Sequence, residues 1–190
     1  MLLYHTGFDE IPVPDLRRGR ANADFGQGFY LSDDPAFAER WATEKKDAQT
    51  FVNRYELHTD DLQIKRFERD EAWFRYIFSN RRRMPDALSD FDVIIGPIAN
   101  DTLYNTFGVL TSGMLDDAVA MALLQLGPAY TQVALKTERA KAALRFLGAA
   151  TLDRDTLAAN KARLAAEEAA FQTLFSETMQ RLLGDTEDGT

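Results

Sequence analysis

Two short segments near the N-terminus carry the side chains best suited to binding a small molecule. In the first, His5 ends an apolar run and is followed by Thr6 and Gly7, which places an imidazole beside exposed backbone groups. In the second, Tyr30 follows a Gly-Gln-Gly turn at residues 26–28, and glycines let a ligand approach the backbone closely. A strand histidine is more often a hydrogen-bonded structural group, and a lone tyrosine more often packs in a core. These residues alone predict an α+β domain in which a ligand cleft is one interpretation.

Later in the chain, three further positions offer polar groups. Gln132 interrupts a late apolar strand. Asn100 and Asp101 follow the apolar segment FDVIIGPI at residues 91–98, where a loop would meet a cleft, although Asn-Asp-Thr is an equally good turn and helix-cap sequence. Neither a GxGxxG fingerprint nor a Walker A phosphate loop occurs. Any nucleotide site must therefore be built from scattered residues.

Composition excludes several classes of site. The chain has 190 residues, which suits one compact domain or one domain with a small appendage. It contains no Cys, which excludes disulfides and Cys-ligated zinc, and with only two His we expect no metal site, although carboxylates alone can hold a metal. The net charge of −8 disfavours non-specific binding to nucleic acid or membranes. With no apolar run near the roughly 20 residues of a membrane span and no signal peptide, we expect a cytoplasmic protein without membrane contact.

Hydrophobic periodicity predicts interleaved strands and helices in the first 150 residues. Strands are expected at residues 2–5, 26–31, 50–57, 62–67, 91–98 and 131–136. Helices are expected after the cap sequence Ser-Asp-Asp-Pro at residues 32–35, at residues 70–80 and 115–126, and after Thr137, with Leu144 inside the last one. We expect a hinge at residues 148–155, so that residues 1–150 form one domain and residues 151–190 a helix with a frayed end.

The tail differs in composition from the rest of the chain. Residues 155–183 contain neither Gly nor Pro and carry apolar residues near a heptad spacing, among them Leu157, Phe171 and Phe175, which predicts one long amphipathic helix. Two interpretations are open. The helix packs back over the body, or it pairs with another chain through its Leu/Phe stripe. We favour the second, with a second copy of this chain or a neutralising protein as the partner.

The order of several segments resembles a bacterial family of unknown function within the ADP-ribosyltransferase superfamily. The similar segments are LYHTG, an IxxPDL loop with a basic end, DFGQGFYLSDDPAFAERWA, VNRYEL, FSNR, FDVIIGPIANDTLY and TQVALKTERAKAALRFL, which together cover roughly residues 2–147. The superfamily variant carries a His-Tyr-Glu signature, in which His5 matches the first position and Tyr30 the second. The resemblance implies an α+β fold with a split β-core, in which two small antiparallel sheets surround an NAD cleft, with peripheral helices and the long C-terminal helix outside it.

The resemblance also implies a role for each motif residue. The backbone of Thr6 would hold the nicotinamide carboxamide, the His5 side chain would bind ribose hydroxyls, and Tyr30 would stack on the nicotinamide ring. Cationic and small residues around these motifs complete the expected NAD contacts, namely Arg17, Arg18 or Arg20 for the pyrophosphate, with Gly7, Phe25, Gly28 and Asn100.

The third position departs from the signature. The family usually has a Glu on a late strand, which orients or deprotonates the acceptor, whereas the matching strand here offers Gln132. A glutamine forms hydrogen bonds but cannot act as a base. Glu138, six residues on, opens a helix, where a carboxylate is favourable for structural reasons alone. We place Gln132 ahead of Glu138 in this role, with Asp101 as a further source of the missing carboxylate.

Together these inferences predict a mono-ADP-ribosyltransferase of the toxin type. It would break the nicotinamide–ribose bond of NAD, its substrate, and transfer ADP-ribose to a macromolecular acceptor, either protein or nucleic acid. The expected catalytic residues are His5, Tyr30, Gln132 and Asp101. Two alternatives stay open: an NAD glycohydrolase that uses water as the acceptor, and a catalytically silent NAD- or nucleotide-binding module whose tail mediates assembly. An antitoxin is a further expected partner of the residue 155–183 helix.

Overall fold

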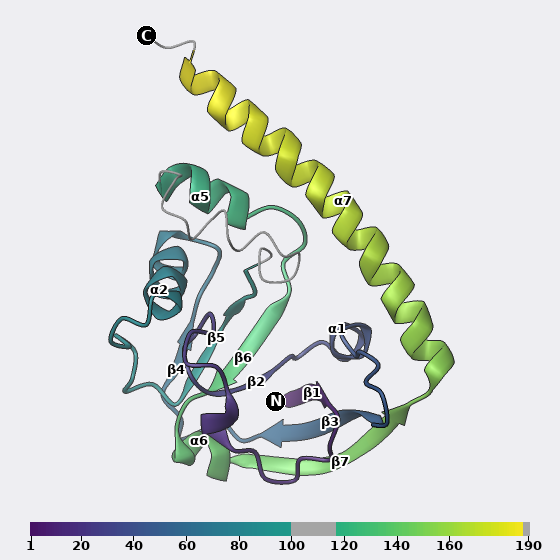
Figure 1. The fold of residues 1–190 in the computed structure, drawn as a ribbon. Coiled ribbons are helices and arrows are strands. Elements are labelled where there is room, and N and C mark those ends of the chain that lie inside the picture. The colour runs from purple at the N-terminus through teal and green to yellow at the C-terminus, as the bar shows by residue number, and fades with distance from the viewer. Residues whose placement is uncertain (100–116, 188–190) are drawn as a thin grey trace.

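The computed structural model describes residues 1–99 and 117–187, and its framework is a pair of small β-sheets surrounded by helices (Figure 1). The first sheet has the order β1-β3-β7, formed by Leu2–Gly7, Thr50–Leu57 and Leu144–Leu152, and its pairs are antiparallel. The second has the order β2-β6-β5-β4, formed by Phe29–Leu31, Thr131–Leu135, Val93–Pro97 and Ile64–Arg66. The expected α+β class with two small sheets is therefore confirmed.

One strand pair departs from the antiparallel sheets that the sequence predicted. β4 and β5 run parallel, with Ile64 opposite Val93. Their connection contains helix α2, Glu71–Arg81, and a helical crossover returns the chain to the same end of a sheet, whereas a hairpin would reverse it. The expectation of antiparallel pairing throughout is wrong at this edge.

The second sheet is buried on both faces. Val93 points toward the first sheet and packs with Leu3 and Tyr55. Its neighbour Ile94 points the other way and packs with Trp73 of α2, because successive strand side chains alternate between faces. A strand that is covered on both sides has no polar face, which explains the continuous apolar run of FDVIIGPI.

The helices of the body begin where the sequence predicts them. α1, Pro35–Arg40, follows Asp34, whose carboxylate accepts the N–H groups of Ala36 and Phe37 at 2.9 and 3.1 Å. Asp70 caps α2 and Thr137 caps α6 in the same way. The remaining described helices are the 3-10 turn η1 at Leu16–Arg18, α5 at Asp117–Leu124, α6 at Glu138–Ala142 and α7 at Arg154–Glu187.

Residues 144–152 form strand β7, where the sequence predicted the end of a helix and the start of a hinge. The expectations of a helix around Leu144 and of a hinge at residues 148–155 are wrong, because β7 pairs with β3 along its whole length. The register shifts between Arg54 and Tyr55, opposite Gly148, whose φ of 125° strongly favours glycine. Leu147 has no partner in the register with β3, so Leu147 and Gly148 together form a bulge within the strand. The expected boundary at residue 150 falls inside β7.

Helix α7 packs against the body. It runs from α1 to α5 along one side of the molecule (Figure 1), and its residues Leu157, Phe171 and Phe175 are buried. Of the two interpretations of the tail, packing on the body is the one that the structure shows. Pairing with another chain through this apolar stripe is wrong for these three residues, because the body already covers them. Leu174, which is 41% exposed, remains at the surface.

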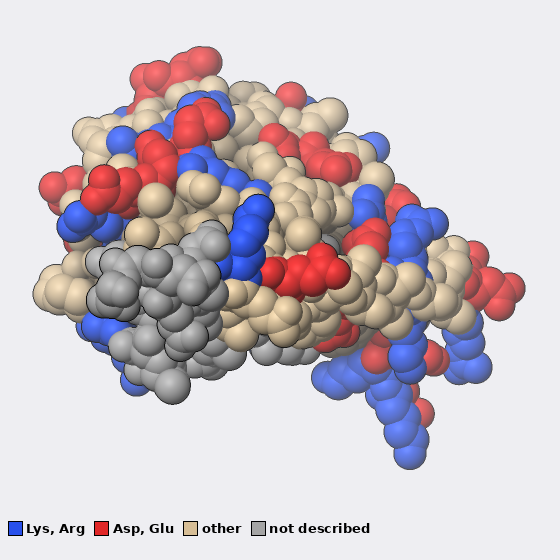
Figure 2. Space-filling view, turned by 90° about the horizontal axis from the view of Figure 1, so that it is seen from above, with Lys and Arg blue, Asp and Glu red and all other residues tan. Residues whose placement is uncertain are grey.

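The surface carries both signs of charge. On the face seen in Figure 2, acidic and basic side chains are interspersed, so neither sign forms a broad field there. Across the residues that the structure describes, no helix combines the length and apolar character required to cross a membrane.

Candidate functional site

A cavity of about 640 Å³ lies between the two sheets, next to the point where they meet. Within the described residues, an isolated backbone bridge joins β1 to the residue that follows β2: Tyr4 and Ser32 exchange hydrogen bonds of 2.8 and 2.9 Å. The cavity is lined from β1, β2, β6, α1 and the loop that precedes β2. Its volume is that of an ordinary small-molecule site.

β1 leaves part of its backbone edge open next to this bridge. Tyr4 directs its N–H and C=O groups at Ser32, and strand alternation puts the N–H and C=O of Thr6 on the same side. His5 and Gly7 direct theirs to β3 instead. No described residue bonds to the main chain of Thr6 on the open side. Thr6 therefore offers a backbone donor and a backbone acceptor side by side.

His5 is held as a hydrogen-bond acceptor. Its Nδ1 lies 2.8 Å from the carbonyl oxygen of Tyr30, and because a carbonyl can only accept, Nδ1 carries the proton and Nε2 keeps a lone pair. Burial lowers the pKa of His5 below its ordinary value of 6.5, with the bond to Tyr30 opposing this in part, so the ring is neutral at neutral pH. The imidazole packs on Phe29, with ring centroids 4.5 Å apart.

Tyr30 lines the cavity, but its hydroxyl is used by the protein itself. The hydroxyl accepts the Phe25 N–H at 3.0 Å and donates to the Gly26 carbonyl at 2.6 Å. Burial, and then the nearby Asp24 carboxylate, raise the pKa of Tyr30 well above its ordinary value, so the hydroxyl keeps the proton that it donates. The ring is thus the part of Tyr30 that can contact a ligand, while the hydroxyl fixes the turn that carries Asp24.

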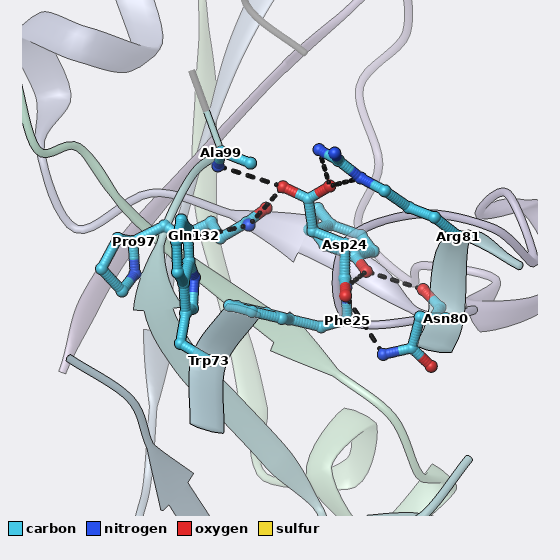
Figure 3. A network of polar contacts seen from close by, with 10 residues as sticks. Asp24, Phe25, Trp73, Asn80, Arg81, Pro97, Ala99 and Gln132 are labelled. Atoms are coloured by element: carbon cyan, nitrogen blue, oxygen red, sulfur yellow. Dashed lines mark hydrogen bonds and ion pairs between the residues drawn. The ribbon is translucent and has the colours of Figure 1, made fainter. Parts of the chain in front are cut away.

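The carboxylate of Asp24 is the centre of a buried network (Figure 3). Its Oδ1 accepts from two nitrogens of Arg81 at 3.0 and 2.8 Å. Its Oδ2 accepts from the backbone N–H of Ala99 and from Nε2 of Gln132, both at 3.2 Å. Two donors on each oxygen fill the lone pairs of a carboxylate. Asp24 is therefore poorly placed to act as a base, although it lines the cavity.

Gln132 has its amide oriented by this network. The side chain reaches the cavity from β6. Its nitrogen donates to Asp24 Oδ2 at 3.2 Å and to the Pro97 carbonyl at 3.4 Å, and both of these atoms can only accept. The nitrogen must therefore face the network, which leaves Oε1 as the atom free to meet a ligand. At this position the chain supplies a fixed acceptor and no base.

Two of the three predicted arginines reach the cavity. Arg18 and Arg20 line it, and neither guanidinium bonds to any residue that the structure describes. Arg17 lies outside the lining, at the surface, where its Nε is 3.5 Å from a carboxylate oxygen of Asp15. The expectation that Arg17 contacts the ligand is therefore not met by this arrangement, whereas Arg18 takes a place beside Arg20.

Gly28, in the glycine-rich turn, is required by the packing of β6 as well as lying at the cavity. Gly28 lines the cavity, and a Cβ at this position would lie 2.5 Å from the carbonyl oxygen of Leu135. The close approach of β6 thus requires glycine here whether or not a ligand is bound. Phe25 is fully buried behind the site and contributes its backbone. Thr6 and Gly7 adjoin His5 without belonging to the lining.

Other predicted positions are not brought to the site. Glu138 is exposed in α6, where it pairs with Lys141 at 2.9 Å. Asn100 and Asp101 lie outside the described residues. Within the described ranges, no group of three His, Asp or Glu side chains is placed to hold a metal ion.

Sequence reasoning missed three residues of the site. The four-residue spacing of Phe37 and Trp41 predicts only a buried stripe on a helix, whereas in the structure the two side chains form an aromatic wall of the cavity. Arg81 opens the basic run at residues 81–83, which the charge pattern alone predicts to be a solvated helix end. That prediction is wrong, because Arg81 is 8% exposed and pairs with Asp24. A signal was present: Arg81 follows Trp73 and Ile77 at four-residue spacing, and this puts all three on the buried face of α2.

The buried pair predicts a large effect of substitution. Arg81→Met leaves the Asp24 carboxylate buried without its counter-charge, and we expect a loss of about 3–5 kcal/mol in the free energy of unfolding. Urea denaturation measures this loss. The double variant Arg81→Met with Asp24→Asn removes both charges and is expected to recover a large part of it.

The control lies in the same helix. Arg75 pairs with Glu71 at the surface, and Arg75→Met is expected to change stability by no more than about 0.5 kcal/mol. Equal losses for Arg75→Met and Arg81→Met would contradict the role that we give to the buried pair.

Comparison with known proteins places the chain in a family. Residues 1–146 match the family described as protein of unknown function (DUF3990), and this match contains all the residues that line the cavity. No curated protein matches the chain. Because the match spans more than half of the sequence, the chain belongs to the DUF3990 family.

Proposed function

We propose that the chain binds NAD in the cavity between the sheets and transfers ADP-ribose from it to a macromolecule, as a mono-ADP-ribosyltransferase of the toxin type. The observation that carries this proposal is the set of groups that the cavity offers. It combines two fixed hydrogen-bond acceptors, two arginines without a described partner and an aromatic wall. NAD offers the complementary set: ribose hydroxyls, a pyrophosphate and two flat ring systems.

The two acceptors suit a ligand that is rich in hydroxyl groups. His5 Nε2 keeps its lone pair because Nδ1 is bound to the Tyr30 carbonyl, and Gln132 Oε1 faces away from the donors that its nitrogen satisfies. Neither atom can donate, so each is matched by a ribose O–H. The orientation of both side chains is set before a ligand arrives, which lowers the entropic cost of binding.

The open edge of β1 suits a primary amide. Thr6 has an N–H and a C=O pointing the same way. A carboxamide such as that of nicotinamide carries one donor and one acceptor at the matching separation, so the two can form a pair of hydrogen bonds. Tyr30, whose ring lines the cavity, would then stack on the nicotinamide.

The charged groups suit a dinucleotide. Arg18 and Arg20 provide positive charge at the cavity, and a guanidinium binds phosphate oxygens through charge-assisted hydrogen bonds. The negative charge of Asp24 is already balanced by Arg81, so it does not repel a pyrophosphate as a free carboxylate would. Asp15 is the other acidic residue of the lining, and its carboxylate lies 3.5 Å from Arg17. Arg18 and Arg20 therefore leave the local field favourable to an anionic ligand even though the whole chain is acidic.

The proposed reaction breaks the bond between the nicotinamide nitrogen and the ribose carbon. Nicotinamide leaves with the bonding electrons, and an oxygen or nitrogen of the acceptor forms the new bond to that carbon and loses its proton. The residues would position these groups: Thr6 holds the leaving amide, and Gln132 holds the ribose. Because Gln132 cannot take a proton and Asp24 is saturated, we propose acceptors that are already nucleophilic or are activated by a carboxylate such as Asp101.

Labelled NAD separates the three candidate activities. We expect incubation of the purified chain with a cell lysate to transfer label to macromolecules, with His5→Ala and Tyr30→Ala each lowering the transfer strongly. Free ADP-ribose with nicotinamide would instead indicate an NAD glycohydrolase. Binding without turnover would indicate a silent module, the alternative that Gln132 in place of Glu keeps open. Near-wild-type turnover in either variant would refute the site assignment.

The neutral state of His5 predicts a pH dependence. Burial lowers the pKa of His5 in the folded protein below its ordinary value of about 6.5. As the pH falls, the imidazole is therefore protonated in the unfolded chain before it is protonated in the folded one. Protonation also converts Nε2 from an acceptor to a donor. We therefore expect the Kd for NAD to be independent of this group above about pH 6.5 and to rise as the pH falls through the lower pKa of the folded protein.

Calorimetric titration between about pH 5 and 8 measures this dependence. His5→Gln should weaken binding and remove the pH-dependent component. His58→Gln is the matched control, because His58 is the only other histidine and has an exposed side chain. An unchanged pH profile in His5→Gln would exclude His5 as its source.

The Asp24–Gln132 contact predicts that restoring the family glutamate is harmful. Gln132→Glu would place a second carboxylate against that of Asp24. The repulsion between the two negative charges would raise the pKa of the introduced carboxyl group and disturb the network. We expect NAD affinity to fall about tenfold, a change of about 1.4 kcal/mol in binding free energy. Binding titrations and turnover assays measure the effect.

A double variant tests whether repulsion between two carboxylates causes the loss of NAD affinity. Asp24→Asn combined with Gln132→Glu keeps one carboxylate in the network and is expected to recover affinity relative to Gln132→Glu alone. Glu138→Gln, in exposed α6, is the control and should behave like wild type. A gain of activity in Gln132→Glu would mean that the site lacks only its glutamate, contrary to our interpretation.

A further inference from the structure

We propose that helix α7 supports the ligand site from behind, with Asn160 and Glu167 acting as positioning residues for its aromatic wall. These residues lie beyond residue 146, where the family match ends. They hold the C-terminal end of α1, the helix next to the cavity. The proposal rests on the proposed function only for the identity of the ligand, since the contacts themselves do not depend on it.

The two side chains of the aromatic wall are carried by the short helix α1 and its C-cap. Phe37 and Trp41 line the cavity and lie one helical turn apart, with ring centroids separated by 5.8 Å. α1 has only six residues, Pro35–Arg40, and Trp41 is its C-cap. An isolated helix of this length is unstable in water, so its position must come from contacts with other elements.

Side chains from two other elements bind the last carbonyls of α1. The Thr6 hydroxyl donates to the Ala38 carbonyl at 2.6 Å from the side of β1. Asn160 Nδ2 donates to the Glu39 carbonyl at 2.8 Å from the side of α7. The final carbonyls of a helix have no partner within it, and the Glu39 carbonyl also accepts the N–H of Ala42 at 3.0 Å. The two side-chain bonds add to this backbone bond to cap the helix. They hold α1 between the first sheet and α7.

Glu167 acts on the same wall through two intermediates. Its Oε1 accepts from Arg40 at 3.0 Å, and the same Arg40 nitrogen donates to the Tyr130 hydroxyl at 2.9 Å. The Tyr130 ring stacks on Phe37, with centroids 4.4 Å apart. Tyr130 also accepts the N–H of Ile98, another lining residue, at its backbone carbonyl. Glu167 thereby fixes the side chains behind the wall without touching the cavity.

These polar contacts are separable from the anchoring of α7. Leu157 near one end of the helix and Phe171 and Phe175 further along are buried, which fixes α7 to the body by apolar packing. Asn160 and Glu167 lie between these anchors and face α1. Their replacement should therefore leave α7 in place and loosen the C-terminal turn of α1.

The chain offers a direct reporter of this effect. It has two tryptophans, Trp41 in the wall and the fully buried Trp73. In a Trp73→Phe background, the fluorescence of Trp41 alone reports on the wall. We expect Glu167→Gln and Asn160→Asp to increase acrylamide quenching of Trp41 without ligand, and to raise the Kd for NAD about fivefold, as loss of a contact of about 1 kcal/mol would. Catalytic turnover at saturating NAD should change less than the Kd.

The controls distinguish positioning from general stability. Glu177→Gln, at an exposed site on the same helix, should leave quenching and Kd unchanged. Thermal unfolding of each variant checks that α7 remains folded, and an Arg40→Met/Glu167→Gln cycle should show that the two effects are not additive. If Glu167→Gln and Asn160→Asp match Glu177→Gln in quenching, the inference is wrong. If quenching rises but wild type does not bind NAD, the positioning role stands and the proposed function fails.

Discussion

The buried carboxylate of Asp24 is the interaction on which the rest of the site depends. It gathers donors from the end of α2, the segment after β5 and the start of β6, through Arg81, Ala99 and Gln132 (Figure 3). A buried charge is costly unless it is paired and its lone pairs are satisfied, and here both conditions are met. Satisfying them requires three distant segments to converge on one side chain. The loop before β2 is thereby fixed against the second sheet, and the cavity acquires one of its walls.

This solution has a chemical consequence for the cavity. A carboxylate that is fully engaged with donors is a good orienting group and a poor base, whereas the amide that it orients becomes a good acceptor. The site therefore divides two tasks that a single glutamate often combines. Asp24 carries the charge and is bound by donors of the protein, whereas Gln132 presents an uncharged acceptor to the cavity. An anionic ligand can approach because the negative charge is matched by Arg81 and free positive charge lies at Arg18 and Arg20.

How much of this could be predicted from the sequence depended on the range of each interaction. Local signals worked: Asp34 and Thr137 capped helices, and FDVIIGPI formed a buried strand. His5, Tyr30 and Gln132, which lie far apart in the sequence, all line one cavity. The failures were non-local. β7 became a strand because β3 offered it a full-length partner, and periodicity within β7 could not reveal this. Arg81 looked like a helix-end charge because its partner lies 57 residues away. Gly28 looked like a ligand-facing glycine, whereas its space is also taken by the backbone of β6.

The bond between His5 and the Tyr30 carbonyl sets the tautomer of the imidazole. The proton on the imidazole is placed by a main-chain atom, and every amino acid at position 30 would supply the same atom. The tautomer is thus encoded in the geometry of two neighbouring strands and is insensitive to the chemistry of the side chain there. Substitutions at Tyr30 can change what the ring and hydroxyl contact while the lone pair on Nε2 stays where it is. The residue at position 30 can therefore change without changing which nitrogen of His5 carries the proton. This holds as long as the bridge between Tyr4 and Ser32 keeps the two strands in register.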